Sequence, residues 1–282
     1  MSPACRAGGP RRAHAVATGL GLALLLGACA PRPAVVPELT RGQRMPRYGA
    51  ALAQRQAKGA MAEAEAVVWT RRAGAGALPA VQATLALARP DRFRLRAQSL
   101  FGTAIDLAAH GDSLTAYLPS RRAGASLDAT RDSLGVRLPG TLACRVMSAD
   151  WQPPEDAWER AAWRDTLLVL RWEEDGDSLA VAVGGGGLPE SVTLTGPAGR
   201  GARVRYEEWR FEDGVMWPAL LVLEDLPRSF SITCRIERVR FRPRPDDQRF
   251  AVRIPGEARR LDRAELRRLL ARLEERWGAR SR

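Results

Sequence analysis

Hydrophobic and polar residues alternate most clearly in the stretch 91–118 of the chain. Phe93, Leu95 and Ala97 share one face of residues 92–98, and the opposite face carries arginines and a glutamine. A period of two is typical of a strand that buries only one face. The alternation therefore predicts a half-buried strand whose apolar side chains point toward a core.

The same alternation recurs along most of the chain and predicts about eleven strands in total. Glycine, aspartate and proline separate these strands about every ten residues, as turns require. This spacing favours one antiparallel sheet that curls on itself rather than two separate domains. Twelve segments carry the pattern and supply these strands, at residues 62–72, 81–88, 92–98, 103–109, 114–118, 165–172, 178–183, 191–195, 202–211, 216–223, 229–241 and 249–254.

Three shorter segments have helical rather than strand patterns. Residues 48–61 are rich in alanine and predict a short helix. Residues 127–134 and 139–148 have irregularly spaced apolar positions, and a proline opens the second of them, where a helix accepts it well. The predicted fold is therefore mainly β, with a few short helices that cover the sheet.

Residues 259–277 predict a longer, C-terminal amphipathic helix. Leucines recur there at helical spacing, and the arginines lie mostly off that apolar stripe. Asp262 and Glu265 have the spacing of a capping box at the start of the helix. Two interpretations stay open: the helix packs on the sheet, or it lies on an anionic membrane surface.

The N-terminus has the pattern of an exported lipoprotein. Arginines precede an apolar run over residues 13–26, which is too short to span a bilayer comfortably. The run ends in Leu-Gly-Ala-Cys, which resembles the bacterial lipobox. That resemblance implies a signal peptide over residues 1–28 and acylation, for example by palmitate, of Cys29. An ordinary signal peptide and an uncleaved anchor are the alternatives.

The residues that follow the cysteine predict a spacer. Residues 29–47 are rich in proline, which favours an extended tether between the lipid anchor and the folded part. The domain is then expected to cover residues 48–282. A lipid-anchored domain of this kind would face the periplasm from the inner leaflet of the outer membrane.

The formal net charge of +12 would fit a nucleic-acid-binding protein. The basic residues are almost all arginine, however, and Lys58 is the only lysine, which is typical of the codon bias of a GC-rich genome. An exported protein also rarely meets nucleic acid. Attraction to anionic lipid or lipopolysaccharide is the better explanation of the charge.

The sequence offers little catalytic chemistry. His110 is the only histidine after the signal segment, and it lies in a predicted turn. We find no cluster of histidine and cysteine with metal-ligand spacing and no Gly-x-Ser-x-Gly motif. The sequence therefore predicts a protein that is not an enzyme and that needs no metal or cofactor.

Two cysteines remain after the signal segment and Cys29. Cys144 and Cys234 could form a disulfide, because the cell envelope permits one. The alternative is that both are small buried residues, as cysteines often are.

Two large apolar residues stand at a predicted loop between two strands. Leu100 and Phe101 are followed by Gly102, although loops are usually polar. Either the two side chains turn back into the core, or they form an exposed apolar knob that touches a membrane or an apolar cargo.

The stretch around this loop resembles the LolA/LolB superfamily of lipoprotein carriers and outer-membrane lipoprotein receptors. The resemblance rests on the basic-aromatic-basic strand 91–95, the Phe-Gly loop and the strand 103–107 with one acid among apolar residues. A Gly-Asp turn and the strand 114–118 follow in the family's order. The similarity is clearest over residues 55–150. The helix 259–277 and the insert around residues 151–162 depart from the typical receptor.

The resemblance implies a half-open antiparallel barrel covered by helices, with an apolar cavity for acyl chains. It also implies that Leu100, Phe101 and Gly102 form a membrane-insertion loop. The residues expected to line the cavity are the apolar positions of the central strands: Leu85, Leu87, Phe93, Leu95, Ile105, Leu107 and Leu114.

The function expected from these features is that of a lipid-anchored protein that binds acyl chains or lipid-modified proteins. Such a protein could accept lipoproteins from a periplasmic carrier protein for insertion into the outer membrane. The alternative is a structural or assembly lipoprotein of the envelope that binds a protein partner without lipid transfer.

Overall fold

The computed structural model describes residues 38–268 except 59, 75, 78, 100–101, 129–139, 197–198, 200 and 267. The chain divides into two compact units, Met1–Pro33 and Ala34–Arg282, and every described residue belongs to the second. The predicted signal peptide, Cys29, most of the tether, Leu100 and Phe101 therefore lie outside the described residues, as does most of the predicted C-terminal helix.

The described part is mainly β. Its helices are α2 (Arg41–Ala57), α3 (Gly140–Ser148), α4 (Glu155–Glu159) and the short 3-10 helices η2 (Pro119–Arg121) and η4 (Asp247–Phe250). A further helical turn begins at Arg263. The strands are β1 (Met61–Arg72), β2 (Gly76–Ala77), β3 (Val81–Ala88), β4 (Arg92–Ser99), β5 (Gly102–His110), β6 (Ser113–Leu118), β7 (Ala123–Asp128), β8 (Ala162–Arg164), β9 (Leu167–Glu174), β10 (Asp177–Val183), β11 (Pro189–Thr195), β12 (Gly201–Glu212), β13 (Val215–Asp225), β14 (Phe230–Arg242) and β15 (Arg259–Arg260).

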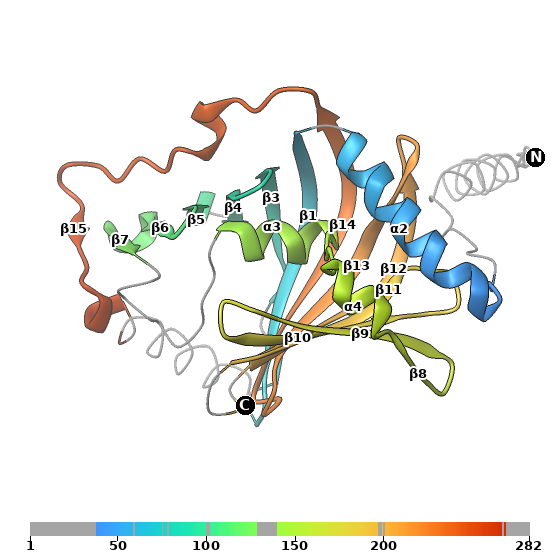
Figure 1. The fold of residues 1–282 in the computed structure, drawn as a ribbon. Helices are drawn as coiled ribbons and strands as arrows, with labels where there is room; N and C mark the ends of the chain where they lie inside the picture. The colour runs from blue at the N-terminus through green and yellow to red at the C-terminus, as the bar shows by residue number, and fades with distance from the viewer. Residues whose placement is uncertain are drawn as a thin grey trace, which may run out of the picture. The chain divides into compact units, whose positions relative to one another are not determined.

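All of these strands belong to one sheet (Figure 1). Its order is β15-β7-β6-β5-β4-β3-β1-β14-β13-β12-β11-β10-β9-β8, and β2 pairs with β1 outside this path. Neighbouring strands pair antiparallel, except for the parallel pair of β15 and β7. The prediction of a single, largely antiparallel sheet is therefore confirmed.

The sheet is less curled than the sequence predicted. The half-open, curled barrel is replaced by an open sheet that is neither closed nor strongly curled, with β15 at one edge and β8 at the other. Closure would require the two edge strands to pair. Instead both edges are very short, with two residues in β15 and three in β8, which limits the unpaired backbone that they expose.

The hairpin turns explain why most strands could be located from the sequence. Gly111, Asp175, Gly176, Asp213 and Gly214 all have positive φ angles. Glycine adopts this conformation without strain and aspartate tolerates it, so these residues select the tight turns of two-residue hairpins. The turns predicted at 110–112, 174–177 and 212–214 are confirmed.

Three predicted elements differ from the structure. Helix α2 begins at Arg41, inside the predicted tether, although Pro46 lies within it. The start of the predicted helix 127–134 belongs to β7, and its remainder lies outside the described residues. The predicted strand 249–254 has no ladder partner, and η4 occupies its start. Alternation alone could not exclude that strand, because an extended segment without a neighbour has the same pattern.

The C-terminal segment binds to the edge of the sheet. Arg259 and Arg260 pair with β7, and the helical turn begins only after Asp262. The predicted capping box is present, since the Asp262 carboxylate accepts a bond from the Glu265 backbone and the Glu265 carboxylate accepts one from the Asp262 backbone. Leu261 and Leu266 pack against β7. The predicted start of the helix 259–277 is therefore wrong, because Arg259 and Arg260 form strand β15; the helical turn that begins at Arg263 packs on the sheet through Leu266.

Candidate functional site

The two faces of the sheet differ in chemistry. The face that we call the inner face is covered by α2, α3 and α4 and carries most of the buried apolar residues (Figure 1). The opposite, outer face carries alternate residues of the same strands, many of them arginines and glutamates. Binding of an apolar ligand therefore has to be sought on the inner face, and binding of an anion on the outer one.

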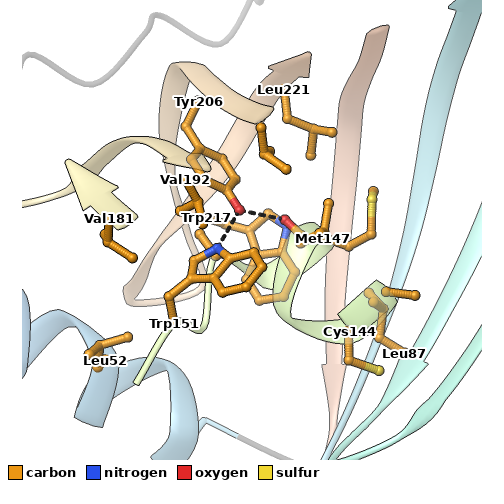
Figure 2. Packing of buried hydrophobic residues seen from close by; sticks show 14 of the residues in the cluster. Leu52, Leu87, Cys144, Met147, Trp151, Val181, Val192, Tyr206, Trp217 and Leu221 are labelled. Carbon is orange, nitrogen blue, oxygen red and sulfur yellow. Dashed lines mark hydrogen bonds between the residues drawn. The ribbon is translucent and has the colours of Figure 1, made fainter. Parts of the chain in front are cut away.

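A hydrogen-bonded aromatic cluster fills the space between the helices and the strands β12 and β13. Nε1 of Trp151 donates to the hydroxyl of Tyr206, a bond drawn as a dashed line in Figure 2, and the two atoms are 2.8 Å apart. Tyr206 donates in turn to the carbonyl oxygen of Val146, and Tyr48 of α2 donates to that of Trp151. Burial raises the pKa of both tyrosine hydroxyls above the ordinary range, so they remain protonated donors. This part of the inner face is a packed core.

Arg55 is completely buried beside this cluster. One of its terminal nitrogens donates to the carbonyl oxygen of Ala149 at 3.1 Å, and its guanidinium lies 5.7 Å from the ring centre of Trp209. Burial lowers the pKa of Arg55, although the nearby tyrosines and Asp150 oppose that effect. These contacts tie the end of α2 to the segment that connects α3 with α4.

Helix α3 begins in direct contact with the hairpins of the central strands. The backbone N–H of Gly140 donates to the carbonyl oxygen of Gly111 at 2.7 Å. A methyl group on Gly140 would lie 1.8 Å from the carbonyl oxygen of Asp91, so only glycine fits there. The close approach fixes α3 over the predicted cavity-lining strands, β4 and β5.

The structure divides the predicted cavity-lining residues into two groups. Leu85, Leu87 and Phe93 are buried in the main core under the helices. The other four are only partly buried. They lie on the inner face toward the β4–β5 loop or toward β6, and they are Leu95, Ile105, Leu107 and Leu114. The described part of the chain therefore leaves a partly exposed apolar area on β4, β5 and β6.

The predicted membrane-insertion loop joins β4 to β5. Leu100 and Phe101 lie outside the described residues, but their flanking residues are described. Ser99 and Gly102 are paired at the end of the two strands, and the Ser99 hydroxyl donates to the Gly102 carbonyl oxygen at 3.1 Å. Gly102 has a φ of 107°, which only glycine adopts without strain. The pairing of β4 with β5 therefore continues to Ser99 and Gly102, at the end of the strands that carry the partly exposed apolar area.

The disulfide that the sequence left open between Cys144 and Cys234 is not formed. Cys144 lies on α3 and Cys234 on β14, and both are free, buried thiols. Burial raises the pKa of each thiol to about 12. They correspond to the alternative interpretation, in which both cysteines are small core residues.

The described residues hold no group of histidine, cysteine, aspartate or glutamate that could bind a metal ion. His110 is exposed at the turn between β5 and β6. Within the same part of the chain, no helix is long and apolar enough to cross a membrane.

The sequence did not reveal two features of this region. Trp151 was assigned to an insert outside the common fold, yet it is completely buried and central to the core. The outer face also forms a hollow of about 260 Å³ lined by arginines of β4 and β14, which are far apart in the sequence. The alternation of arginine with apolar residues could be seen in both strands. The order and register of the strands, which place β4 and β14 around one hollow, could not be read from the sequence.

Comparison with solved structures shows the LolA-type fold. The neighbours include a protein domain from Vibrio parahaemolyticus named for outer-membrane lipoprotein sorting, at 13% identity and a TM-score of 0.50, covering 72% of this chain and 97% of that one. A LolA superfamily protein from Nitrosomonas europaea matches at 16% identity and a TM-score of 0.52, covering 76% and 98%. A DUF1329 family protein from Desulfovibrio piger matches at 10% identity and a TM-score of 0.53, covering 74% and 96%.

Identities this low establish the fold alone. No protein-family model and no curated protein sequence matches the chain. The sequence around the Phe-Gly loop resembles the LolA/LolB superfamily, and the fold of the sheet is similar to that of a LolA superfamily protein, so the expected type of fold is confirmed.

Proposed function

We propose that this protein is a lipoprotein of the cell envelope that binds acyl chains or lipid-modified proteins on the inner face of its sheet. In this proposal Cys29 carries the lipid anchor, and the domain faces the periplasm from the inner leaflet of the outer membrane. It receives lipoproteins from a periplasmic carrier and passes them to that membrane. The LolA-type fold supports a carrier that binds rather than an enzyme.

The observation that carries the proposal is the partly exposed apolar area on β4, β5 and β6. Leu95, Leu107 and Leu114 pack against the core on one side and remain accessible on the other. Each methylene of an acyl chain that leaves water for such a surface contributes about 0.8 kcal/mol. Several methylenes therefore suffice for useful affinity without any polar contact.

The β4–β5 loop would complete the path to the membrane. It lies at the end of the strands that carry Leu95 and Ile105. An apolar loop beside an apolar surface would allow an acyl chain to pass from one to the other without crossing water. Leu100 and Phe101 would then enter the bilayer during transfer.

The proposal is tested by photo-crosslinking of the full chain, purified in non-ionic detergent, with a palmitate analogue that carries a diazirine. Mass spectrometry of the digested protein should place the crosslinks on β4, β5 and β6. Leu114→Gln should reduce crosslinking, because it puts an amide into the apolar surface. Thr115→Gln is the matched control, since Thr115 is the next residue and points to the outer face.

Circular dichroism and thermal unfolding must show that both variants are folded. Crosslinks confined to other parts of the chain, or equal yields for the two folded variants, would contradict acyl binding on this face. A protein partner that co-purifies in equal amount, with no lipid bound, would favour an assembly role instead.

A further inference from the structure

The outer face of the sheet contains a hollow that the proposed function does not use. It has a volume of about 260 Å³ and is bordered by β14, β1, β3, β4 and the segment that includes η4. Five arginines and two glutamates belong to its lining: Arg94, Arg96, Arg238, Arg240, Arg249, Glu63 and Glu65. The small side chains of Thr84 and Ala86 on β3 leave the space between the two groups of arginines.

The pairing of β1 with β14 brings these residues together. Arg240 is opposite Glu63, and Arg238 is opposite Glu65. On the other side of β1, Glu63 is opposite Ala86, which in turn is opposite Arg94 on β4. Two strands, β4 and β14, that are more than 130 residues apart in the sequence thus place arginines on both sides of one hollow.

The acidic groups nearby are already engaged. Asp106 accepts bonds from Nε of Arg94 at 2.8 Å and from a terminal nitrogen of Arg96 at 3.1 Å. Burial alone would raise the pKa of Asp106, but these two guanidinium groups outweigh it and hold the pKa below its ordinary value. Asp106 is therefore ionised, and its carboxylate is bonded to the two arginines of β4.

Glu63 is engaged in the same way. Its carboxylate accepts a bond from Nε of Arg242 at 2.9 Å and lies 3.4 Å from Arg249. Glu65 approaches Arg238 only at 3.9 Å. The side chain of Arg240 is exposed and makes no hydrogen bond or ion pair with any residue that the structure describes. Positive charge therefore remains in excess around the hollow.

We propose that this hollow binds the phosphate group of an anionic phospholipid headgroup. Arginine presents several N–H donors in a planar fork that matches phosphate oxygens, and it stays charged at every physiological pH. Arg238, Arg240 and Arg249 would supply the contacts, and Arg96 would add a partly exposed charge on the other side.

A lipid headgroup at a membrane surface fits better than free phosphate, because the positive residues continue beyond the hollow. Arg92 and Arg242 extend the same outer face by one more row of the sheet, where Arg92 also pairs with Asp247 and Arg242 with Glu63. A single free phosphate could contact only a few of these residues, whereas a layer of anionic headgroups would contact them all. This inference concerns the outer face and does not depend on cargo binding to the inner one.

The test uses the full chain in non-ionic detergent and isothermal titration with short-chain lipids. Dihexanoyl phosphatidylglycerol should bind, and dihexanoyl phosphatidylcholine, which has no net charge, should bind at least about tenfold more weakly. The double variant Arg238→Gln with Arg240→Gln should lose about tenfold in affinity for phosphatidylglycerol for each phosphate contact removed. Inorganic phosphate should bind more weakly than phosphatidylglycerol.

The matched control is Arg164→Gln with Arg171→Gln. These arginines are exposed on β8 and β9, outside the hollow, so the control removes the same charge. Equal loss in both double variants would show that only net charge matters and would overturn the site. Equal affinity for the two lipids would do the same. Inorganic phosphate that binds as tightly as phosphatidylglycerol would overturn the assignment to a lipid headgroup.

Discussion

Nε1 of Trp151 donates a hydrogen bond to the hydroxyl of Tyr206 at 2.8 Å, and this bond joins the segment between α3 and α4 to β12. Both side chains are almost completely buried. The Tyr206 hydroxyl in turn donates a hydrogen bond to the carbonyl oxygen of Val146 in α3. One hydroxyl thus positions two segments of the helical layer on the inner face of the sheet.

Tyr206→Phe should lower the free energy of unfolding by about 1–3 kcal/mol, because it leaves a buried indole N–H and a buried carbonyl without this partner. Tyr117→Phe is the matched control. Its hydroxyl makes no hydrogen bond with the described residues, and the change should stay within about 0.5 kcal/mol. Urea unfolding followed by circular dichroism measures both. Equal stability of the two variants would show that the bond does not hold the helical layer.

Asp106→Asn should destabilise the protein in a pH-dependent way. The folded-state pKa of Asp106 lies below its ordinary value, despite the opposing effect of burial, because Arg94 and Arg96 bond to its carboxylate. A depressed pKa stabilises the fold above the unfolded pKa of about 3.9, and this contribution is lost as the pH falls through the folded pKa. The wild type should therefore exceed the variant by about 1–3 kcal/mol at neutral pH.

The difference between wild type and Asp106→Asn should then shrink as the pH is lowered below about 4. Thermal unfolding over a series of acidic buffers measures this effect. Asp112→Asn, at an exposed turn position, should follow the wild type throughout. A difference that stays constant down to low pH would contradict the ionic role of Asp106.

Phe101→Glu should leave the fold intact and weaken delivery of cargo to a membrane. Burying a phenylalanine side chain contributes about 1.5–3 kcal/mol, so its replacement by a charge should reduce transfer by about tenfold or more. The measurement is transfer of a fluorescent acylated peptide from the full chain to phospholipid vesicles. Gln98→Glu, an exposed change of the same charge on the same hairpin, should transfer normally. Normal transfer by Phe101→Glu would exclude a role of the loop in insertion.

The strands and their turns could be predicted because both depend on local chemistry. Gly111, Gly176 and Gly214 accept positive φ angles, and the residues on either side alternate with a period of two. The register within each hairpin then follows from the turn. The opening of the sheet could not be predicted in this way, since it depends on whether β8 and β15 meet, and these edges are far apart in the sequence.

The features of the candidate site also differ in whether the sequence could predict them. The Arg-rich face of β4 and the apolar face that carries Leu95 and Leu107 were both visible as alternation. The helices that cover the sheet decide which of those apolar residues are buried, and the sequence did not show where these helices lie. Trp151 was missed because a single tryptophan in an irregular segment has no periodicity.

The sequence by itself determined the β architecture, the tight turns, the alternation of arginines with apolar residues in β4 and the capping box of Asp262 and Glu265, because each depends on residues close along the chain. Only the tertiary structure decided that Arg240 lies opposite Glu63, that Tyr206 receives the indole of Trp151 and that the sheet stays open. The physical reason is that these contacts depend on the pairing and packing of distant segments, where burial of apolar surface by the whole fold selects the register.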